Sequence, residues 1–168
     1  TVKGGYRLTD AVTIQIATPR GVLPAEATGV FLGRNADLEA VRKALTRRNV
    51  RIPLVVLDGM PGIGKSTISQ AIAYDQELVA EFPDGILWTS LGGDPNVVKQ
   101  MAEWGSFFDD DSILECATPS AARSRLSPLL RGKRLLLIVD DVWDVADAIP
   151  FVKAPGDACA ILATTRMS

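Results

Sequence analysis

Short, nearly continuous apolar runs alternate with amphipathic segments along most of the chain after residue 53. The runs rich in Val, Ile and Leu predict strands at 54–58, 85–91, 134–141 and 159–165. Helices are predicted between these runs, from Lys65 to about Tyr74, after Pro95 and from Pro119 onward. Apolar strands that are separated by helices are typical of a parallel sheet covered on both faces. The pattern therefore predicts an α/β fold, with a mainly parallel sheet between two layers of helices.

The N-terminal part of the chain has a different pattern. Residues 11–17 alternate apolar and polar side chains, which predicts a short strand, and residues 18–29 are rich in Pro and Gly, as linkers are. A helix is predicted from about residue 35, with Asn35 as its N-cap and with Leu38, Val41 and Leu45 on one apolar face. We therefore expect an N-terminal extension or linker at 1–26 and one domain at 27–168.

The composition excludes several kinds of chemistry. The 168 residues include no histidine, which removes Ser-His-Asp and Cys-His catalysis and histidine-based zinc sites. The cysteines Cys116 and Cys159 are too few for a Cys₄ site, and they favour a reduced, cytoplasmic setting over a disulfide framework. No apolar run approaches the ~20 residues that cross a bilayer. The net charge of −2 argues against a general nucleic-acid-binding domain.

A glycine-rich turn joins the predicted strand at 54–58 to the next helix. The pattern G-x-x-x-x-G-K-[ST] is matched in full by Gly59, Met60, Pro61, Gly62, Ile63, Gly64, Lys65 and Ser66. Glycine lets successive backbone N–H groups point toward one centre, and the start of a helix adds unpaired N–H groups, so the turn predicts a phosphate site. We expect Lys65 to reach the β- and γ-phosphates of a nucleotide, Ser66 to bind Mg²⁺ and Thr67 to lie near the α-phosphate.

Charged residues follow two other predicted strands. Asp140 and Asp141 end a strongly apolar strand, and ligands of open α/β sheets bind at the carboxyl ends of strands. We expect Asp140 to hold Mg²⁺ through its water and Asp141 to orient or deprotonate an attacking water. At the end of the last strand, Thr164 or Thr165 is a candidate to bond a γ-phosphate or a water, and Arg166 is a candidate γ-phosphate sensor. The alternatives are two solvated acids and an exposed arginine.

Five blocks of sequence carry a family resemblance: FLGR (31–34), GMPGIGKST (59–67), EFPDGILWTSLG (81–92), LLLIVDDVW (135–143) and GDACAILATTR (156–166). In this order they resemble the NB-ARC family of signalling ATPases, in the STAND class that includes plant disease-resistance proteins and apoptosome-type factors. The chain looks like a bacterial member. The resemblance implies a P-loop NTPase fold and contacts to adenine by Phe31, Leu32, Gly33 and Arg34. It also implies adenine specificity, which the phosphate loop alone does not give.

The same resemblance implies an ATP/ADP switch. The family holds ADP at rest, opens for assembly when ATP replaces it, and resets by slow hydrolysis, so we expect adenine nucleotide and Mg²⁺ as cofactors. Self-association of the full-length protein, an upstream effector domain and a downstream sensor domain are further expectations. The chain begins with Thr1 and stops before the family's helical lid and winged-helix domain, so we expect a C-terminally incomplete piece. The strand that flanks the phosphate-loop strand is also absent, which predicts an open sheet edge.

Two other functions remain as alternatives. One is a high-turnover P-loop ATPase or small-molecule kinase. Two observations argue against it: the sequence contains no transporter-type signature such as LSGGQ, and no acceptor pocket can be read from it. The other is a scaffold that keeps ADP and never hydrolyses ATP. The three aromatic residues Trp88, Trp104 and Trp143 are expected to be buried or partly buried rather than binding platforms.

Overall fold

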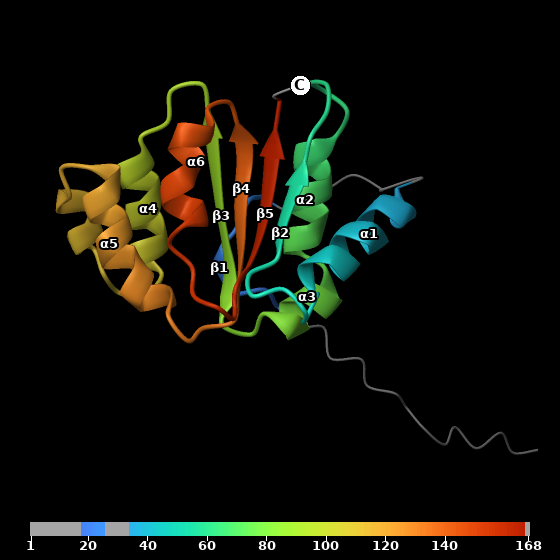
Figure 1. Ribbon diagram of the computed structural model, residues 1–168, viewed down its shortest axis with the longest axis horizontal. Coiled ribbons are helices and arrows are strands. Elements are labelled where there is room, and N and C mark those ends of the chain that lie inside the picture. Colours follow the sequence, from blue (N-terminus) through green and yellow to red (C-terminus); the bar gives the residue numbers. More distant parts are fainter. Residues whose placement is uncertain (1–17, 26–33, 167–168) are drawn as a thin grey trace, which may run out of the picture.

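A five-stranded parallel sheet lies between two layers of helices in the computed structural model, which describes residues 18–25 and 34–166 (Figure 1). The strands are β1 (Gly21–Val22), β2 (Leu54–Leu57), β3 (Gly85–Gly92), β4 (Leu135–Val142) and β5 (Ala160–Thr165), in the order β1-β3-β4-β5-β2. One face is covered by α1 (Asn35–Leu45), α2 (Lys65–Ala73) and α3 (Gln76–Glu81). The other is covered by α4 (Val97–Ser106), η1 (Ser112–Glu115), α5 (Pro119–Leu130) and α6 (Val145–Val152). The predicted three-layer α/β/α fold is confirmed.

The central strand β4 explains why the sheet needs helices on both faces. Successive side chains of a strand point to opposite faces. Accordingly Leu135, Leu137 and Val139 join the core under α4, α5 and α6, whereas Leu136 and Ile138 join the core under α1, α2 and α3. All of them are fully buried, and each contributes roughly 1.5–3 kcal/mol relative to an exposed position.

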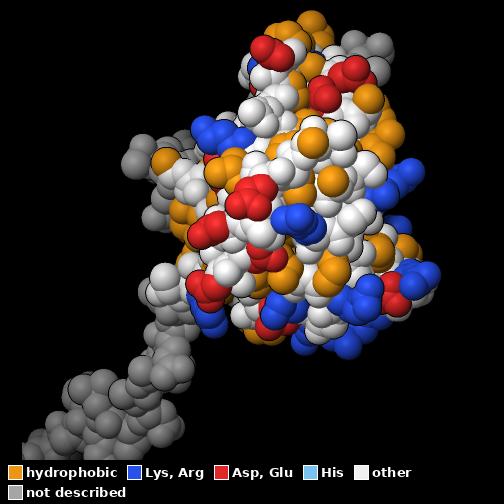
Figure 2. Space-filling view, turned by 90° about the vertical axis from the view of Figure 1, so that its left-hand side faces the viewer, with side chains coloured by type: hydrophobic (Ala, Val, Ile, Leu, Met, Phe, Trp, Pro, Cys, Tyr) orange, Lys and Arg blue, Asp and Glu red, His pale blue; other side chains and the backbone are white. Residues whose placement is uncertain are grey.

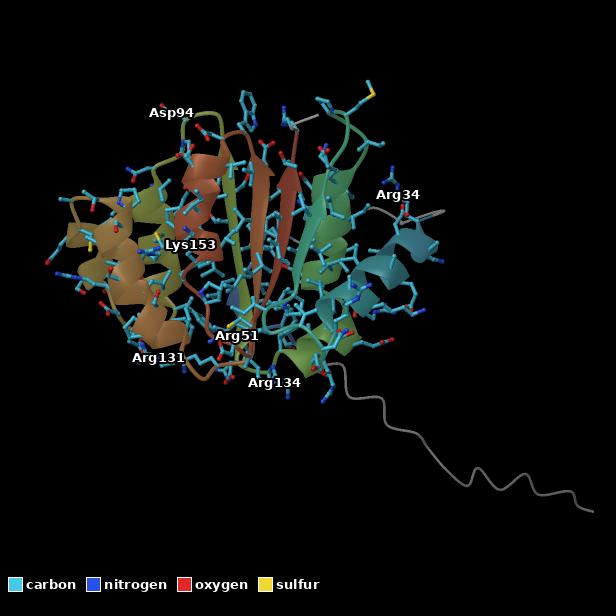
Figure 3. All side chains as sticks on the ribbon, viewed as in Figure 1. Arg34, Arg51, Asp94, Arg131, Arg134 and Lys153 are labelled. Atoms are coloured by element: carbon cyan, nitrogen blue, oxygen red, sulfur yellow. The ribbon has the colours of Figure 1, made fainter. Side chains whose placement is uncertain are left out.

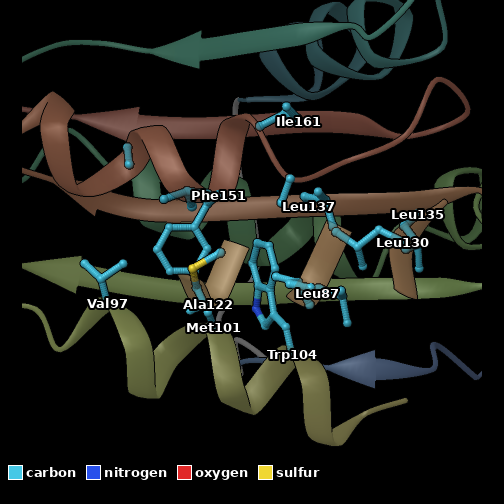
Figure 4. Packing of buried hydrophobic residues seen from close by; sticks show 14 of the residues in the cluster. Leu87, Val97, Met101, Trp104, Ala122, Leu130, Leu135, Leu137, Phe151 and Ile161 are labelled. Atoms are coloured by element: carbon cyan, nitrogen blue, oxygen red, sulfur yellow. The ribbon is translucent and has the colours of Figure 1, made fainter. Parts of the chain in front are cut away.

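Trp104 organises the larger core. Its ring meets Phe151 of α6 edge to face, with centroids 5.0 Å apart, and lies among Leu87, Met101 and their neighbours (Figure 4). The indole N–H donates a hydrogen bond of 3.0 Å to the backbone oxygen of Trp88, so this buried donor is satisfied. The contact ties α4 to β3.

The elements predicted from periodicity are largely confirmed. The predicted strands match β2 to β5 within one residue at each end, and α5 begins at Pro119 with Thr118 as its N-cap. Two helices, α3 and α6, were missed. Each follows an aspartate that caps it: Asp75 accepts the N–H of Leu78 at 3.1 Å, and Asp144 accepts that of Ala146 at 2.8 Å. An Asp before a short apolar stretch was the available signal.

One prediction for the N-terminal part is wrong, and one strand there was not predicted. Asn35 is not the N-cap of α1: the helix begins at Asn35, Arg34 occupies the cap, and no side chain caps the helix. The Pro- and Gly-rich segment at 18–29 also contributes strand β1, because the Arg20 carbonyl accepts the N–H of Ile86 at 2.8 Å and the next two residues pair with β3. Gly21 permits this pairing, since a Cβ there would lie 1.8 Å from the Ile86 oxygen. The predicted strand at 11–17 lies outside the described residues.

The phosphate-loop strand is an edge strand, as predicted. Within the described residues β2 pairs only with β5, and its Leu54 and Val56 side chains are 49% and 52% exposed. They line an apolar groove of about 380 Å³ together with residues of β5 and α6. The open edge leaves backbone groups and apolar side chains of β2 exposed to water.

Charges of both signs occur on the side of the molecule where α4 and α5 lie. Figure 2 looks onto this side and shows acidic and basic side chains interspersed. This mixture agrees with the small net charge of −2.

Candidate functional site

The sheet order brings three chain segments together at one edge. Strand β5 lies between β4 and β2, and all three run in the same direction, so their carboxyl ends are neighbours (Figure 1). Leu57 of β2 lies two residues before the glycine-rich turn begins, and it pairs with Thr164 of β5. The turn after β2, the aspartates of β4 and the end of β5 therefore share one site, as the sequence predicted from the general rule for open α/β sheets.

The glycine-rich turn forms one side of this site and connects β2 to α2. Gly62 and Gly64 adopt left-handed conformations with φ of 79° and 93°, which side chains with a Cβ rarely adopt. Gly64 is the N-cap of α2, and its carbonyl accepts the N–H of Ile68 at 3.0 Å. The first N–H groups of α2 have no partner within the helix and lie at its positive end. Asp58, which the motif does not include, shapes the first turn by accepting the N–H of Gly59 at 2.7 Å.

Two cations contact the turn. The Lys65 ammonium donates to the carbonyls of Gly59 and Met60, so it lies over the loop rather than in solvent. Arg34 donates to the carbonyl of Ile63 and brings the start of α1 to the loop. Figure 3 shows Arg34 at this corner, whereas Arg51, Arg131 and Arg134 lie toward the amino end of the sheet.

The remaining predicted nucleotide-binding residues are of two kinds. Pro61 and Thr67 are exposed, and Met60 is 76% exposed, as expected for residues that can meet a ligand. Phe31, Leu32 and Gly33 lie outside the described residues.

Asp140 is buried between two hydroxyls. Asp140 is 5% exposed, and its carboxylate accepts a hydrogen bond from the Thr164 hydroxyl at 2.6 Å. Burial raises the pKa of Asp140, while hydrogen bonds from Thr164 and Ser66 oppose the rise. The structure thus places Ser66 beside Asp140, although they are far apart in sequence. One carboxylate and one hydroxyl suit Mg²⁺, which commonly takes one or two carboxylates plus phosphate oxygens. The described residues hold no cluster of three acids, His or Cys, so phosphate oxygens and water molecules would complete such a site.

Asp141 lies at an irregularity of β4. The pairing of β4 with β5 shifts register between Val139 and Val142, and Asp141 has a left-handed φ of 56°, which is rare for a residue with a Cβ. The shift turns its carboxylate toward the end of β5. There Oδ1 accepts Arg166 Nε at 2.7 Å.

Thr164 links the two aspartates, a role that the sequence did not reveal. Its hydroxyl donates to Asp140 and accepts the N–H of Asp141 at 2.8 Å, and the side chain is 1% exposed. Its only proton is therefore used within the protein rather than free for a phosphate. Only the register of β4 against β5 makes this contact possible.

The tryptophan at the end of the acidic motif is not buried. Trp88 and Trp104 are 9% and 0% exposed, which confirms the expectation for them, but Trp143 is 51% exposed and contradicts it. Trp143 follows the register shift, so it leaves the sheet at the carboxyl edge instead of entering a core. The guanidinium of Arg166 lies 5.0 Å from its ring centroid.

Comparison with known proteins agrees with this geometry. Residues 34–168 match the family model of the NB-ARC domain. The chain belongs to the NB-ARC family. An uncharacterised WD repeat-containing protein of Nostoc sp. is 32% identical over 132 residues, covering 74% of the chain and 10% of that protein. Human apoptotic protease-activating factor 1 is 31% identical over 145 residues, covering 82% of the chain and 11% of the factor. A probable disease resistance protein of Arabidopsis thaliana is 30% identical, covering 82% of the chain and 17% of that protein.

A solved structure supports the fold of this NB-ARC chain. The Aeropyrum pernix ORC2 protein, in ADPNP and ADP complexes, has a TM-score of 0.51 and 16% identity, and the match covers 86% of the chain and 43% of that protein. The membership and the fold together make the chain a nucleotide-binding P-loop module of a signalling family. It spans only 10% to 17% of the curated relatives named above. No helix in its described part is long and apolar enough to cross a membrane.

Proposed function

We propose that this NB-ARC domain is a nucleotide-dependent switch that binds ADP at rest, exchanges it for ATP and hydrolyses ATP slowly with Mg²⁺. The observation that carries the proposal is the convergence of three contacts at one sheet edge: Lys65 over the glycine-rich turn, Ser66 beside Asp140, and Arg166 on Asp141. Phosphoryl transfer depends mainly on positioning and on charges that stabilise the phosphates. These side chains are of the kinds that supply both.

The proposed roles follow the positions of the side chains. Lys65 would bind the β- and γ-phosphates, and Ser66 and Asp140 would hold Mg²⁺, which neutralises phosphate charge when bound. Thr67 would lie near the α-phosphate. Asp141 would orient a water molecule, and Arg166 would sense a terminal phosphate.

Adenine recognition is proposed for residues 31–34. Of these, Arg34 alone is described, and its bond to the Ile63 carbonyl places it beside the loop. The domain boundary at 27, the effector and sensor domains, and self-association in the full-length protein are carried over from the family as proposals. A cytoplasmic location is proposed from the two free cysteines, Cys116 and Cys159.

Slow turnover has its own support in the structure. Asp141, the proposed base, accepts a hydrogen bond from Arg166 Nε at 2.7 Å, so this carboxylate oxygen is occupied by the guanidinium and is not free to bond an attacking water. This contact favours the switch over the high-turnover ATPase or kinase.

The proposal is tested by titrating ADP and then ATP, each with Mg²⁺, into the chain by calorimetry. Lys65→Ala should abolish or strongly weaken ADP binding. Lys43→Ala is the matched control, because Lys43 is 75% exposed on α1 and pairs only with Glu39 among the described residues. ADP that binds at least as tightly as ATP would favour a resting ADP form. Unchanged affinity in Lys65→Ala, or no binding of either nucleotide, would overturn the proposal.

Hydrolysis is tested separately with Asp141→Asn. Asn tolerates the left-handed φ of 56° at this position, so the backbone should stay unchanged. The variant should slow ATP turnover and leave ADP binding nearly intact. Equal loss of both would remove Asp141 from the proposed role, and no turnover in the unmodified chain would favour the non-hydrolysing scaffold.

A further inference from the structure

Trp143 has a fixed place at the carboxyl edge despite its exposure. The side chain is 51% exposed, and its ring packs on Gly93, where a Cβ would lie 3.1 Å from ring atoms Cε3 and Cζ3. On the ring lies the guanidinium of Arg166, 5.0 Å from the centroid. The indole therefore bridges the loop after β3 and the end of β5, two segments that share no hydrogen-bonded strand pairing.

Arg166 is held from two directions. Its Nε donates to Asp141 Oδ1 at 2.7 Å, while its plane contacts the Trp143 ring. The side chains of Arg166 and Asp141 are 44% and 22% exposed, and an ion pair with this exposure contributes little alone. Contact with an indole is the strongest cation–π interaction among the aromatic side chains. The contact with the ring therefore stabilises this position of Arg166 by a free energy comparable with that of the ion pair.

The position of Asp141 is in turn set by the sheet. Its N–H bonds to Thr164 at 2.8 Å and its backbone is left-handed, so the carboxylate cannot follow Arg166 far. A movement of Arg166 toward another anion would break both its bond to Asp141 and its contact with Trp143.

We propose that Trp143 is a positioning residue that holds Arg166 on Asp141 and so opposes transfer of Arg166 to the terminal phosphate of a nucleoside triphosphate. The inference rests on the proposed function for its nucleotide part. ADP has no γ-phosphate to attract Arg166, so the ring lowers affinity for ATP and leaves affinity for ADP unaffected. Trp143 thereby biases the site toward the diphosphate.

The first test needs no nucleotide. The urea midpoint is measured for the unmodified chain, for Trp143→Leu, for Arg166→Gln and for the double variant. Replacement of the ring should shift the midpoint less when Arg166 is already replaced, because the shared contact is then gone. Trp143→Phe keeps an aromatic face and should retain most of the coupling. Additive shifts would show that the two side chains do not support each other, and would overturn the inference.

The second test compares ATP and ADP by calorimetry. Trp143→Leu should tighten ATP binding about twofold to fivefold, the size of an exposed cation–π contact, with ADP binding unchanged. Gly93→Ala, which displaces the ring without removing it, should act in the same direction. Trp143→Phe should stay close to the unmodified chain, and Trp143→Leu should have no effect in an Arg166→Gln background. Equal changes for ATP and ADP would indicate a merely structural role and overturn the inference.

Failure of the proposed function has a different signature. If the unmodified chain binds neither nucleotide, the proposed function and the nucleotide part of this inference are both overturned. The coupling in urea would still support the positioning of Arg166 by Trp143.

Discussion

Thr164 offers a direct test of how the site is held together. Its hydroxyl donates to the Asp140 carboxylate at 2.6 Å and accepts the Asp141 N–H at 2.8 Å, and the side chain is 1% exposed. Thr164→Val keeps the shape and removes both bonds. A hydrogen bond to a charged group is worth about 1.5–3 kcal/mol and a neutral one about 0.5–1.5 kcal/mol. Asp140 keeps the Ser66 side chain as a polar neighbour that lowers its pKa, which moderates the loss. We therefore expect a loss of about 2–3 kcal/mol in the free energy of unfolding.

Thr89→Val is the matched control. Thr89 lies on β3 and is 4% exposed, and it takes no part in the bonds that join Thr164 to Asp140 and Asp141. The same substitution there should change stability much less, because neither of the bonds to the two aspartates is lost.

The assay is urea denaturation followed by far-UV circular dichroism, with EDTA and without nucleotide. With a slope of about 1–3 kcal/mol per M urea, Thr164→Val should lower the midpoint by roughly 1 M or more. Thr164→Ser, which keeps the hydroxyl and loses a methyl group, should lose only about 1 kcal/mol. If Thr164→Val and Thr89→Val behave alike, the hydroxyl does not hold the two aspartates in place, and the geometry described for them is wrong.

Three further predictions concern other parts of the molecule. Gly21→Ala should detach β1, because its Cβ would lie 1.8 Å from the Ile86 oxygen. Hydrogen exchange at the Ile86 amide should then speed up at least tenfold, and unchanged protection would exclude β1 from the sheet. Cys159 is 2% exposed and burial raises its pKa, so less thiolate is present at any pH than in a free cysteine. Iodoacetamide at pH 8 should therefore label Cys116 first, as followed by mass spectrometry. The reverse order of labelling would contradict the described burial. Val56→Lys places a charge on the open edge at a 52% exposed position, so light scattering on heating should decrease with little change in stability. Unchanged aggregation would show that the protein does not aggregate through this edge.

The sequence alone determined the layers and the main parts of the candidate site. The run Leu135–Val139 has no polar residue, and a strand with two apolar faces requires helices on both sides, which is a local property of the chain. The glycine-rich turn could also be predicted, because its motif is contiguous and its glycines are required by backbone geometry. The general rule for strand ends then placed Asp140, Asp141 and Arg166 at the same edge.

Only the tertiary structure decided how these side chains meet. The bond between Thr164 and Asp140, the pairing of Arg166 with Asp141 and the exposure of Trp143 depend on the register of β4 against β5, including its shift after Val139. No local pattern encodes a register between strands that lie far apart in sequence. The same holds for β1, whose two residues form a strand only because the backbone of β3 offers them a partner. Periodicity reports which faces are apolar, whereas pairing and contact are set by packing energies of the whole fold.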